Sequence, residues 1–220
     1  MRLSDVTDAI EAKLNVTVLS SQYQIIAYLY DVRSASAGDI LSNCHPESTA
    51  FYKTLKDLEG AGALCSNQGG KDRRTKHYQL ADTVRQSIDN HNKNLPRWIQ
   101  SKLENSDSGT QVNLNQYVDL LQKNLKIRIF SWHYQIIICL YDLKPASAGE
   151  IFALCDRSST TVYTALSQLE KAGLIRSNKN GVDRRRKYYC LAETTRQILD
   201  EEHRRMHTWV ISKIGEFDGE

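Results

Sequence analysis

The sequence predicts a mainly α-helical protein with small β-hairpins, built from two copies of one domain. Its 220 residues are 40% hydrophobic and 25% charged, which is the composition of a globular protein. In most segments the apolar residues return every three to four positions, which is the period of an amphipathic helix. The tetrapeptide at 23–26, Tyr-Gln-Ile-Ile, returns unchanged at 134–137, so the same pattern is written twice.

The repeat covers most of the chain. At an offset of 111, residues 14–103 align without a gap with residues 125–214, and about 40 of those 90 positions are identical. A period of this length is too long for a solenoid and indicates a duplicated domain. The polar stretch 104–111 has the composition of a flexible linker. We therefore expect repeat 1 at 1–103 and repeat 2 at 112–220.

The first two helices of each copy are predicted from the spacing of apolar residues. The first helix is expected at 3–14 and again at 113–125, and the second at 20–31 and again at 131–142. The apolar positions are Leu120, Leu121 and Leu125 in the first helix, and Ile25, Ile26, Leu29 and Tyr30 in the second.

A capping box predicts the start of the third helix. Ser36-x-x-Asp39 and its counterpart Ser147-x-x-Glu150 place a hydroxyl and a carboxylate three residues apart. These two groups satisfy free backbone N–H groups at the first turn of a helix. Short helices are therefore expected to start at Ser36 and Ser147.

A fourth helix is expected at 46–61 and again at 157–172. One side of it carries an apolar stripe at helical spacing. Gly62 and Gly173 stand where a C-terminal glycine usually ends a helix. The stripe consists of Phe51, Leu55 and Leu58 in the first copy, and of Val162, Leu166 and Leu169 in the second.

After the fourth helix the sequence period changes from helix to strand. Short strands are expected at 63–66 and 174–177. A glycine-containing turn follows in each copy, and basic strands are expected after it at 73–80 and 184–191. This order predicts a two-stranded ribbon in each copy. A long helix then completes each copy, and Pro96 predicts a kink or break in the first version only.

Helix, short helix, recognition-type helix and β-ribbon follow one another in the order of a winged helix-turn-helix. The details resemble the MarR family of multiple-antibiotic-resistance regulators. The fourth helix is similar to that family's Leu-x-x-Leu-Glu-x-x-Gly-Leu ending, here Leu166 to Leu174, with Ala63 in place of the last Leu in the first copy. The family's wing pattern is matched by Asp72, Arg74, Tyr78 and Leu80, and by Asp183, Arg185, Tyr189 and Leu191.

The chain departs from that family in one respect. Family members usually carry one such unit and pair through their terminal helices, whereas this chain carries two units. The resemblance therefore implies a tandem winged helix-turn-helix repeat that forms an internal pseudo-dimer and acts as a monomer. Two-fold pairing would place two recognition helices about one DNA turn apart, roughly 34–36 Å. It also implies a sequence-specific transcription regulator, in the commoner case a repressor, that binds double-stranded DNA.

The basic wings and the exposed face of the fourth helix are the expected DNA-contacting surfaces. Guanidinium groups suit phosphates and narrow minor grooves, and the resemblance implies this role for Arg74 and Arg185. Hydroxyls near a helix N-terminus bond phosphates or base edges. The alternative is a solvated hairpin with ordinary helix caps. The expected DNA-binding residues are Arg73, Arg74, Lys76, Arg184, Arg185, Arg186 and Lys187 in the wings, and Ser48, Thr49, Tyr52, Lys53, Ser159, Thr160, Tyr163 and Thr164 on the helices.

The two copies differ in charge although the whole chain carries only +3. Residues 45–78 hold six Lys/Arg against four Asp/Glu, a net charge of +2. Residues 156–189 hold eight against three, a net charge of +5. We therefore expect the second copy to bind DNA more strongly than the first.

Aromatic residues form a second candidate site. The resembled family often binds aromatic acids between its dimer helices and its DNA-binding lobe, which implies a small aromatic effector here. The residues that would line such a pocket are Tyr23, Trp98, Trp132, Tyr134 and Trp209. The favoured alternative is core packing between the repeats.

No metal site or redox switch is predicted. His203 and His207 have the i, i+4 spacing of metal ligands, but Arg204 and Arg205 oppose a bound cation, so a solvated helix face is expected. Cys44 and the matching cysteine of the second copy, Cys155, are interpreted as packing residues rather than thiol switches. The expected cofactor set is therefore empty.

Other function classes fit the sequence less well. No nucleophile elbow, phosphate loop or dinucleotide fingerprint is present, so we do not expect an enzyme. No apolar run reaches about 18 residues, and the N-terminus is charged, so a cytoplasmic location is expected. Plasmid replication initiators also use two winged helices, but their repeats are usually divergent. A protein-binding winged-helix scaffold needs no basic wing.

Overall fold

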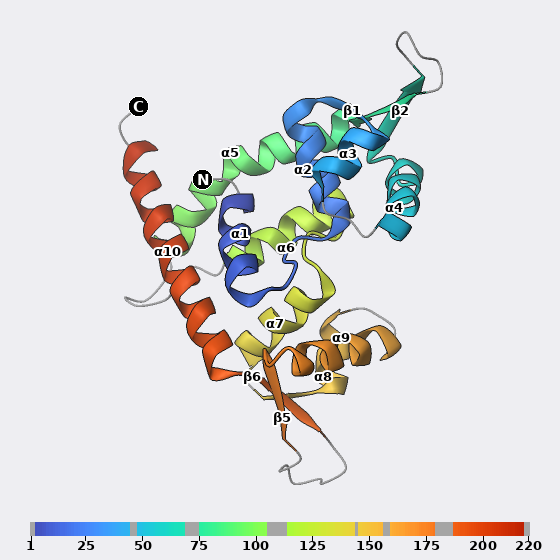
Figure 1. Cartoon of the computed structure of the whole chain (residues 1–220). Coiled ribbons are helices and arrows are strands. Elements are labelled where there is room, and N and C mark those ends of the chain that lie inside the picture. Colours follow the sequence, from blue (N-terminus) through green and yellow to red (C-terminus); the bar gives the residue numbers. More distant parts are fainter. Residues whose placement is uncertain are drawn as a thin grey trace. The chain divides into compact units, whose positions relative to one another are not determined.

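Two compact units make up the structure, a computed structural model (Figure 1). Unit 1 consists of Met1–Leu19 and Phe130–Trp209, and unit 2 of Ser20–Ile129 and Val210–Glu220. Within them the structure describes residues 3–44, 48–68, 75–104, 114–143, 145–155, 159–178 and 187–217.

The elements follow the same order in both copies. The first copy comprises α1 (Leu3–Leu14), α2 (Ser21–Val32), β1 (Ser34–Ser36), α3 (Ala37–Asn43), α4 (Ser48–Gly60), β2 (Leu64–Gln68), β3 (Lys76–Leu80) and α5 (Asp82–Glu104). The second comprises α6 (Leu114–Leu125), α7 (Trp132–Leu143), β4 (Ala146–Ser147), α8 (Ala148–Cys155), α9 (Ser159–Lys171), β5 (Ile175–Asn178), β6 (Tyr188–Leu191) and α10 (Glu193–Phe217). The predicted helices are confirmed to within a residue or two.

The two units exchange the first helices of the repeats. By sequence α1 begins repeat 1, yet it belongs to unit 1 together with α7–α10 of repeat 2 up to Trp209. In return α6, which begins the second copy, packs against α5 in unit 2. Packing therefore divides the chain differently from the predicted boundaries at 1–103 and 112–220, which stay a prediction about the duplication itself.

Each unit contains a three-stranded antiparallel sheet instead of the predicted two-stranded ribbon. The strand orders are β1-β3-β2 and β4-β6-β5. The third strand comes from the residues just before the short helix, where Ala35 pairs with Tyr78 and Ala146 pairs with Tyr189. Strands of three and two residues are too short to show an alternating pattern, so the sequence did not reveal them.

The predicted helix ends are confirmed. The Ser36 hydroxyl accepts from the Asp39 N–H at 3.2 Å, while the Asp39 carboxylate accepts from the Ser36 N–H at 3.1 Å. The counterpart Ser147–Glu150 pair forms the same two bonds at 3.3 and 2.7 Å. Gly62, beyond the end of α4, has φ +72, a backbone conformation that glycine adopts without a steric penalty.

The apolar stripe of α4 and α9 forms the centre of each winged domain. All six stripe residues are buried, and Phe51 is completely inaccessible to solvent. The prediction for α6 is partly wrong, because Leu121 and Leu125 are buried whereas Leu120 is 44% exposed. Consecutive helical residues point about 100° apart, and the buried face of α6 is centred on Leu121 and Leu125, so Leu120 lies at its edge.

The predicted break at Pro96 is wrong. The helix α5 runs unbroken from Asp82 to Glu104. A proline removes one i→i−4 hydrogen bond, which here would run to the carbonyl of Asn92. Asn92, Lys93 and Asn94 are exposed, so solvent can satisfy the freed carbonyl and the helix continues.

Candidate nucleic-acid interface

The outward face of α4 and α9 carries a tyrosine at matched positions. Tyr52 is 63% exposed and Tyr163 is 57% exposed. Each follows a buried residue of the apolar stripe, and the Phe51 ring contacts the Tyr52 ring edge-on with centroids 5.2 Å apart. The core side of the helix thereby directs the neighbouring tyrosine outward.

The other predicted helix residues occupy the same two elements. Lys53, Thr160 and Thr164 are exposed. The backbone of Ser48, Thr49 and Ser159 begins the two helices, while their side chains lie outside the described part of the structure. The described face thus carries a phenol and an ammonium group on α4, and a phenol and two hydroxyl groups on α9.

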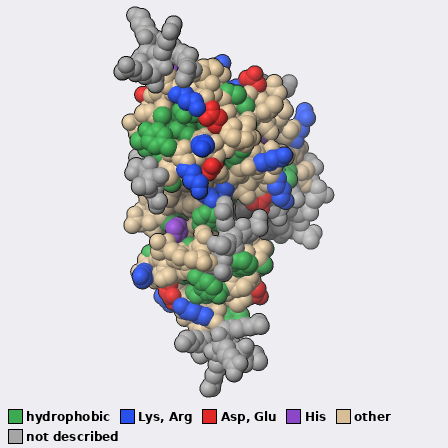
Figure 2. Space-filling model, turned by 90° about the vertical axis from the view of Figure 1, so that its right-hand side faces the viewer, with side chains coloured by type: hydrophobic (Ala, Val, Ile, Leu, Met, Phe, Trp, Pro, Cys, Tyr) green, Lys and Arg blue, Asp and Glu red, His purple; other side chains and the backbone are tan. Residues whose placement is uncertain are grey.

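The predicted arginines of the wings lie outside the described residues. This applies to Arg73, Arg74, Arg184, Arg185 and Arg186. On the face of the molecule in Figure 2, the Lys and Arg side chains stand among acidic and apolar ones rather than in one patch. The wing arginines therefore stay predictions.

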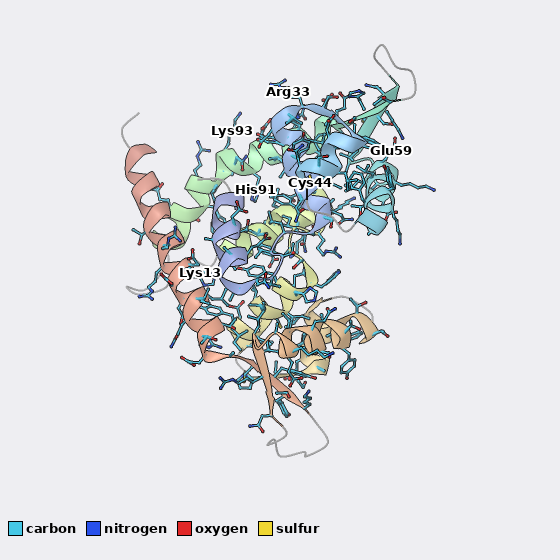
Figure 3. All side chains as sticks on the ribbon, viewed as in Figure 1. Lys13, Arg33, Cys44, Glu59, His91 and Lys93 are labelled. Carbon is cyan, nitrogen blue, oxygen red and sulfur yellow. The ribbon has the colours of Figure 1, made fainter. Side chains whose placement is uncertain are left out.

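A polar cluster ties the base of the first wing to α4. The Lys76 ammonium on β3 lies 2.9 Å from a carboxylate oxygen of Glu59, near the C-terminal end of α4 (Figure 3). The Ser66 hydroxyl on β2 donates to the same carboxylate, and Lys76 Nζ lies 5.1 Å from the centre of the Tyr78 ring. The Ser66 and Lys76 donors hold the pKa of Glu59 below its usual range.

The second wing repeats this cluster. Lys187 Nζ lies 2.9 Å from Glu170, the Ser177 hydroxyl donates to Glu170, and Lys187 lies 5.1 Å from the Tyr189 ring centre. Two of the predicted DNA-contacting residues, Lys76 and Lys187, thus have partners inside the fold. Sequence reasoning missed the role of Glu59 and Glu170, although a glutamate stands at this position in both copies.

A second repeated contact joins the long helix to α2. Arg85 of α5 donates to the carbonyl oxygens of Tyr30 at 3.0 Å and Leu29 at 3.2 Å, at the end of α2. Its guanidinium carbon lies 5.1 Å from the Tyr30 ring centre, and the Tyr30 hydroxyl donates to Asp89 at 2.5 Å. The arginine therefore adds side-chain donors at the end of α2, where the Leu29 carbonyl also accepts from the Arg33 backbone N–H at 3.0 Å.

The counterpart contact is looser. Arg196 of α10 reaches the Leu140 carbonyl at 3.5 Å and lies 5.3 Å from the Tyr141 ring centre. The Tyr141 hydroxyl donates to Asp200 at 2.6 Å. In both units, the long helix thus contacts the winged domain through an arginine and an aspartate at equivalent positions.

The predicted effector residues fall into different surroundings. Tyr134 is 3% exposed and packs edge-on against Phe130, with centroids 5.1 Å apart, so it is a core residue of unit 1. Burial raises the pKa of Tyr23 to about 12. Trp98 and Trp132 are half-buried, and the Trp209 side chain lies outside the described residues.

The cysteine and histidine positions carry no metal site within the described residues. No group of three or more His, Cys, Asp or Glu there is placed to hold an ion. Cys44 ends α3, donates to the Gln24 carbonyl at 3.5 Å, and burial raises its pKa to about 11, so it is a poor thiolate (Figure 3). The side chains of Cys155 and His207 are not among those described.

The expected solvated position of His203 is wrong. His203 is half-buried and packs edge-on against Tyr141, with ring centroids 4.9 Å apart. Burial holds its pKa below the usual value.

Among the described helices, none has the length and apolar character required to cross a membrane.

Acidification is expected to destabilise the chain through His91. Burial lowers the pKa of His91 from 6.5 to about 4, so the unfolded state binds this proton more tightly. Stability is therefore independent of this group above pH 6.5 and falls as the pH drops from 6.5 towards 4. Between about pH 7 and about pH 5, His91→Gln should lose less Tm than the wild type, as measured by circular dichroism.

Two other groups set the limits of that measurement. His203 has the same sign of shift, so part of the decline remains in the variant. The carboxyls of Glu59 and Glu170 have pKa values held below 4.5 and act only in more acidic solution. An identical pH dependence of Tm in the two proteins would contradict the prediction.

Comparison with known proteins gives one family match. The model of the MarR family matches residues 132–187, about a quarter of the chain. The matched segment begins with α7, includes β4, α8, α9 and β5, and ends just before β6. A comparison with curated proteins finds no match.

Comparison with solved structures gives partial matches of low similarity. The transcriptional regulator PA4135 is 22% identical over 40% of this chain and 64% of its own, with a TM-score of 0.33. Reduced AbfR bound to DNA is 22% identical over 40% and 61%, with a TM-score of 0.31. BpsR of Bordetella bronchiseptica, whose DNA binding is regulated by 6-hydroxynicotinic acid, is 12% identical over 61% and 83%, with a TM-score of 0.31. The matched part of this chain covers less than two thirds of the length of PA4135 and of AbfR.

Proposed function

We propose that this chain is a DNA-binding transcription regulator in which α4 and α9 enter the major groove and the two wings contact flanking minor grooves. The observation that carries the proposal is the matched pair of exposed tyrosines, Tyr52 and Tyr163, on the outward faces of these helices. The match of residues 132–187 to the MarR family supports it for the second copy.

The helix face has the chemistry that DNA contact requires. A tyrosine supplies a hydroxyl for a phosphate or a base edge and a ring for the thymine methyl group. The residues that precede the two tyrosines are buried, which holds the helix in one rotation about its axis. The exposed Lys53 in the first copy and Thr164 in the second stand one position further on.

The polar clusters at the wing bases hold the first residue of β3 against α4, and the residue just before β6 against α9. We assign Lys76 and Lys187 to this anchoring, because each ammonium lies 2.9 Å from a glutamate of the recognition helix. The wing arginines Arg74 and Arg185 then take the phosphate and minor-groove contacts. Helix and wing thus approach DNA as one body.

The duplicated sequence supports a pseudo-dimer within one chain. Two recognition helices about one DNA turn apart, roughly 34–36 Å, would read two half-sites that need not be identical. Repression by blocking polymerase is the proposed outcome. A monomeric chain of 25.1 kDa in sedimentation would support this arrangement, and a dimer would contradict it.

The proposal is tested by DNA binding at several salt concentrations. A labelled random duplex of about 30 base pairs is titrated with wild type and with Arg74→Ala/Arg185→Ala, followed by fluorescence anisotropy. The slope of log K against log salt should fall by about two in the variant, because each arginine releases about one counterion. Arg185→Ala alone should weaken binding more than Arg74→Ala alone, because its copy carries +5.

A matched control separates specific contacts from net charge. Lys123, an exposed lysine on α6, lies off the proposed interface, so Lys123→Ala removes a charge without a DNA contact. It should leave the salt slope unchanged. Absence of DNA binding at low salt would overturn the proposal and favour a protein-binding scaffold, whereas equal slopes in all variants would overturn the wing assignment.

A further inference from the structure

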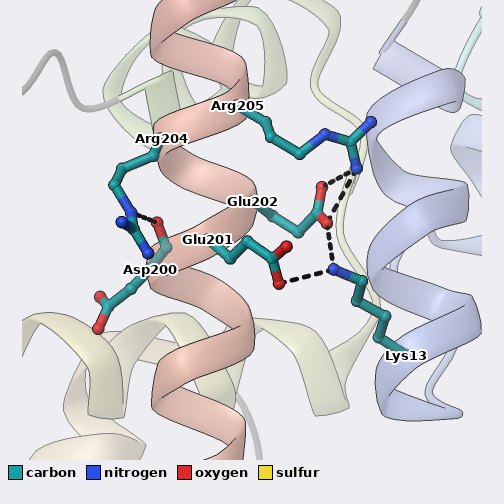
Figure 4. A network of polar contacts seen from close by, with 6 residues as sticks. All are labelled: Lys13, Asp200, Glu201, Glu202, Arg204 and Arg205. Carbon is teal, nitrogen blue, oxygen red and sulfur yellow. Dashed lines mark hydrogen bonds and ion pairs between the residues drawn. The ribbon is translucent and has the colours of Figure 1, made fainter.

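An ion cluster around one buried carboxylate joins α1 to α10 inside unit 1 (Figure 4). Lys13 of α1 lies 2.8 Å from a carboxylate oxygen of Glu201 and 2.9 Å from one of Glu202. Arg205, one turn further along α10, contacts both oxygens of Glu202 at 3.0 and 3.1 Å. One carboxylate therefore holds two cations, one from its own helix and one from α1.

Glu202 differs from an ordinary surface glutamate in its burial. Its side chain is 2% exposed, whereas those of Lys13 and Arg205 are 36% and 62% exposed. A carboxylate removed from water is unfavourable unless cations and donors surround it. Arg205 supplies one such cation from the same helix, and Lys13 of the neighbouring helix supplies a second.

The first copy carries different residues at the equivalent places. At the offset of 111, Asn124 on α6 corresponds to Lys13, and His91 on α5 corresponds to Glu202. The other members of the cluster, Glu201 and Arg205, are matched by Asn90 and Asn94. The equivalent positions of unit 2 therefore hold uncharged residue types where unit 1 has an ion cluster.

Among the side chains that the structure describes, the buried positions of the two exchanged helices match. They are Thr7, Ile10 and Leu14 in α1, and Val118, Leu121 and Leu125 in α6. These triplets occupy equivalent positions at the offset of 111 and present surfaces of similar size. Hydrophobic burial stabilises either helix on either domain, so another feature has to select between them.

We propose that the Lys13–Glu202 pair determines which first helix docks on which copy of the domain. The second copy, through Glu202, accepts a helix with a lysine at this position, and the first copy, through His91, accepts a helix with an asparagine. The unexchanged arrangement is unfavourable at both places. It would leave Glu202 without the lysine of α1, and it would place Lys13 against His91 in place of a glutamate.

The selection is tested by zero-length cross-linking of the full chain. A water-soluble carbodiimide joins a lysine amine to a carboxylate that it contacts, and mass spectrometry of the peptides identifies the pair. The expected product links Lys13 to Glu201, because Glu201 is 56% exposed and open to the reagent. It should form within monomeric chains. A link from Lys13 to Asp89 of α5, or a link found only between two chains, would overturn the proposal.

Exchange of the two side chains tests their causal role. In the variant Lys13→Asn/Asn124→Lys the amine moves to α6, and a new link from position 124 to Glu201 should appear. Persistence of α1 beside α10, detected as protection of its backbone amides with no link to position 124, would mean that the ion pair does not select the helix.

A second variant keeps the test decisive if the exchange variant unfolds. Lys13→Glu/Glu202→Lys preserves an opposite pair with reversed signs, and it should recover at least half of the Tm lost by Lys13→Glu alone. Lys123→Asn removes an exposed lysine of α6 and serves as the matched control without a Tm shift. Equal Tm losses in the single and the reversed-pair variants would overturn the proposal.

Discussion

Phe51→Ala is expected to lower the free energy of unfolding of unit 2 by about 3–5 kcal/mol. Phe51 is completely buried and is the first residue of the α4 stripe that packs into the domain core. Its removal takes away transfer free energy and leaves a cavity that rigid helices and a sheet cannot close. The loss also loosens α4, so DNA binding should weaken together with stability.

The second copy supplies the matched control for this substitution. Val162 occupies the equivalent position on α9 and is 3% exposed. Val162→Ala removes two methyl groups, so we expect a loss of about 2 kcal/mol. Urea denaturation followed by fluorescence measures both variants. A smaller loss for Phe51→Ala than for Val162→Ala would contradict the packing of α4 described above.

Arg85→Ala should destabilise the chain by about 2–3 kcal/mol, which is the second largest effect that we expect. Arg85 donates to two carbonyls at the end of α2, at 3.0 and 3.2 Å, and lies over the Tyr30 ring. Its loss leaves two part-buried carbonyls without this donor and removes the cation from the ring. The result would be seen as a lower urea midpoint with an unchanged m-value.

Two further variants show whether geometry or charge is responsible. Arg85→Lys keeps the positive charge but cannot reach two carbonyls in one plane, so it should recover less than half of the loss. Arg196→Ala should have a smaller effect than Arg85→Ala, because its bond to the Leu140 carbonyl is 3.5 Å long. Full rescue by lysine would contradict the role of the planar guanidinium.

Local sequence signals predicted much of the fold. The capping pairs Ser36–Asp39 and Ser147–Glu150 located the short helices because a hydroxyl and a carboxylate three residues apart satisfy the first turn. The buried stripe of α4 followed from its 3.6-residue period. These signals act within one or two helical turns, so one sequence contains all the information that they need.

Contacts between distant residues could not be predicted in this way. The exchange of α1 depends on Lys13 and Glu202, which lie far apart in sequence and show no shared pattern. The ion pairs of Lys76 and Lys187 with helix glutamates were hidden, because a basic hairpin has the same sequence whether its lysines face DNA or the protein. For the wing arginines the sequence remains the only basis of the prediction.

The exchanged helix has a consequence for the order in which the chain is made. The ribosome releases α1 well before Phe130–Trp209, the segment of unit 1 that covers its buried residues. At about 5–20 residues per second, the side chains of Ile10 and Leu14 wait roughly 10–40 s for their partners. During that interval the helix is a short amphipathic segment with an uncovered apolar face, which chaperones recognise. Because synthesis runs from the N-terminus, α1 can pack into unit 1 only after residues 130–209 have been made.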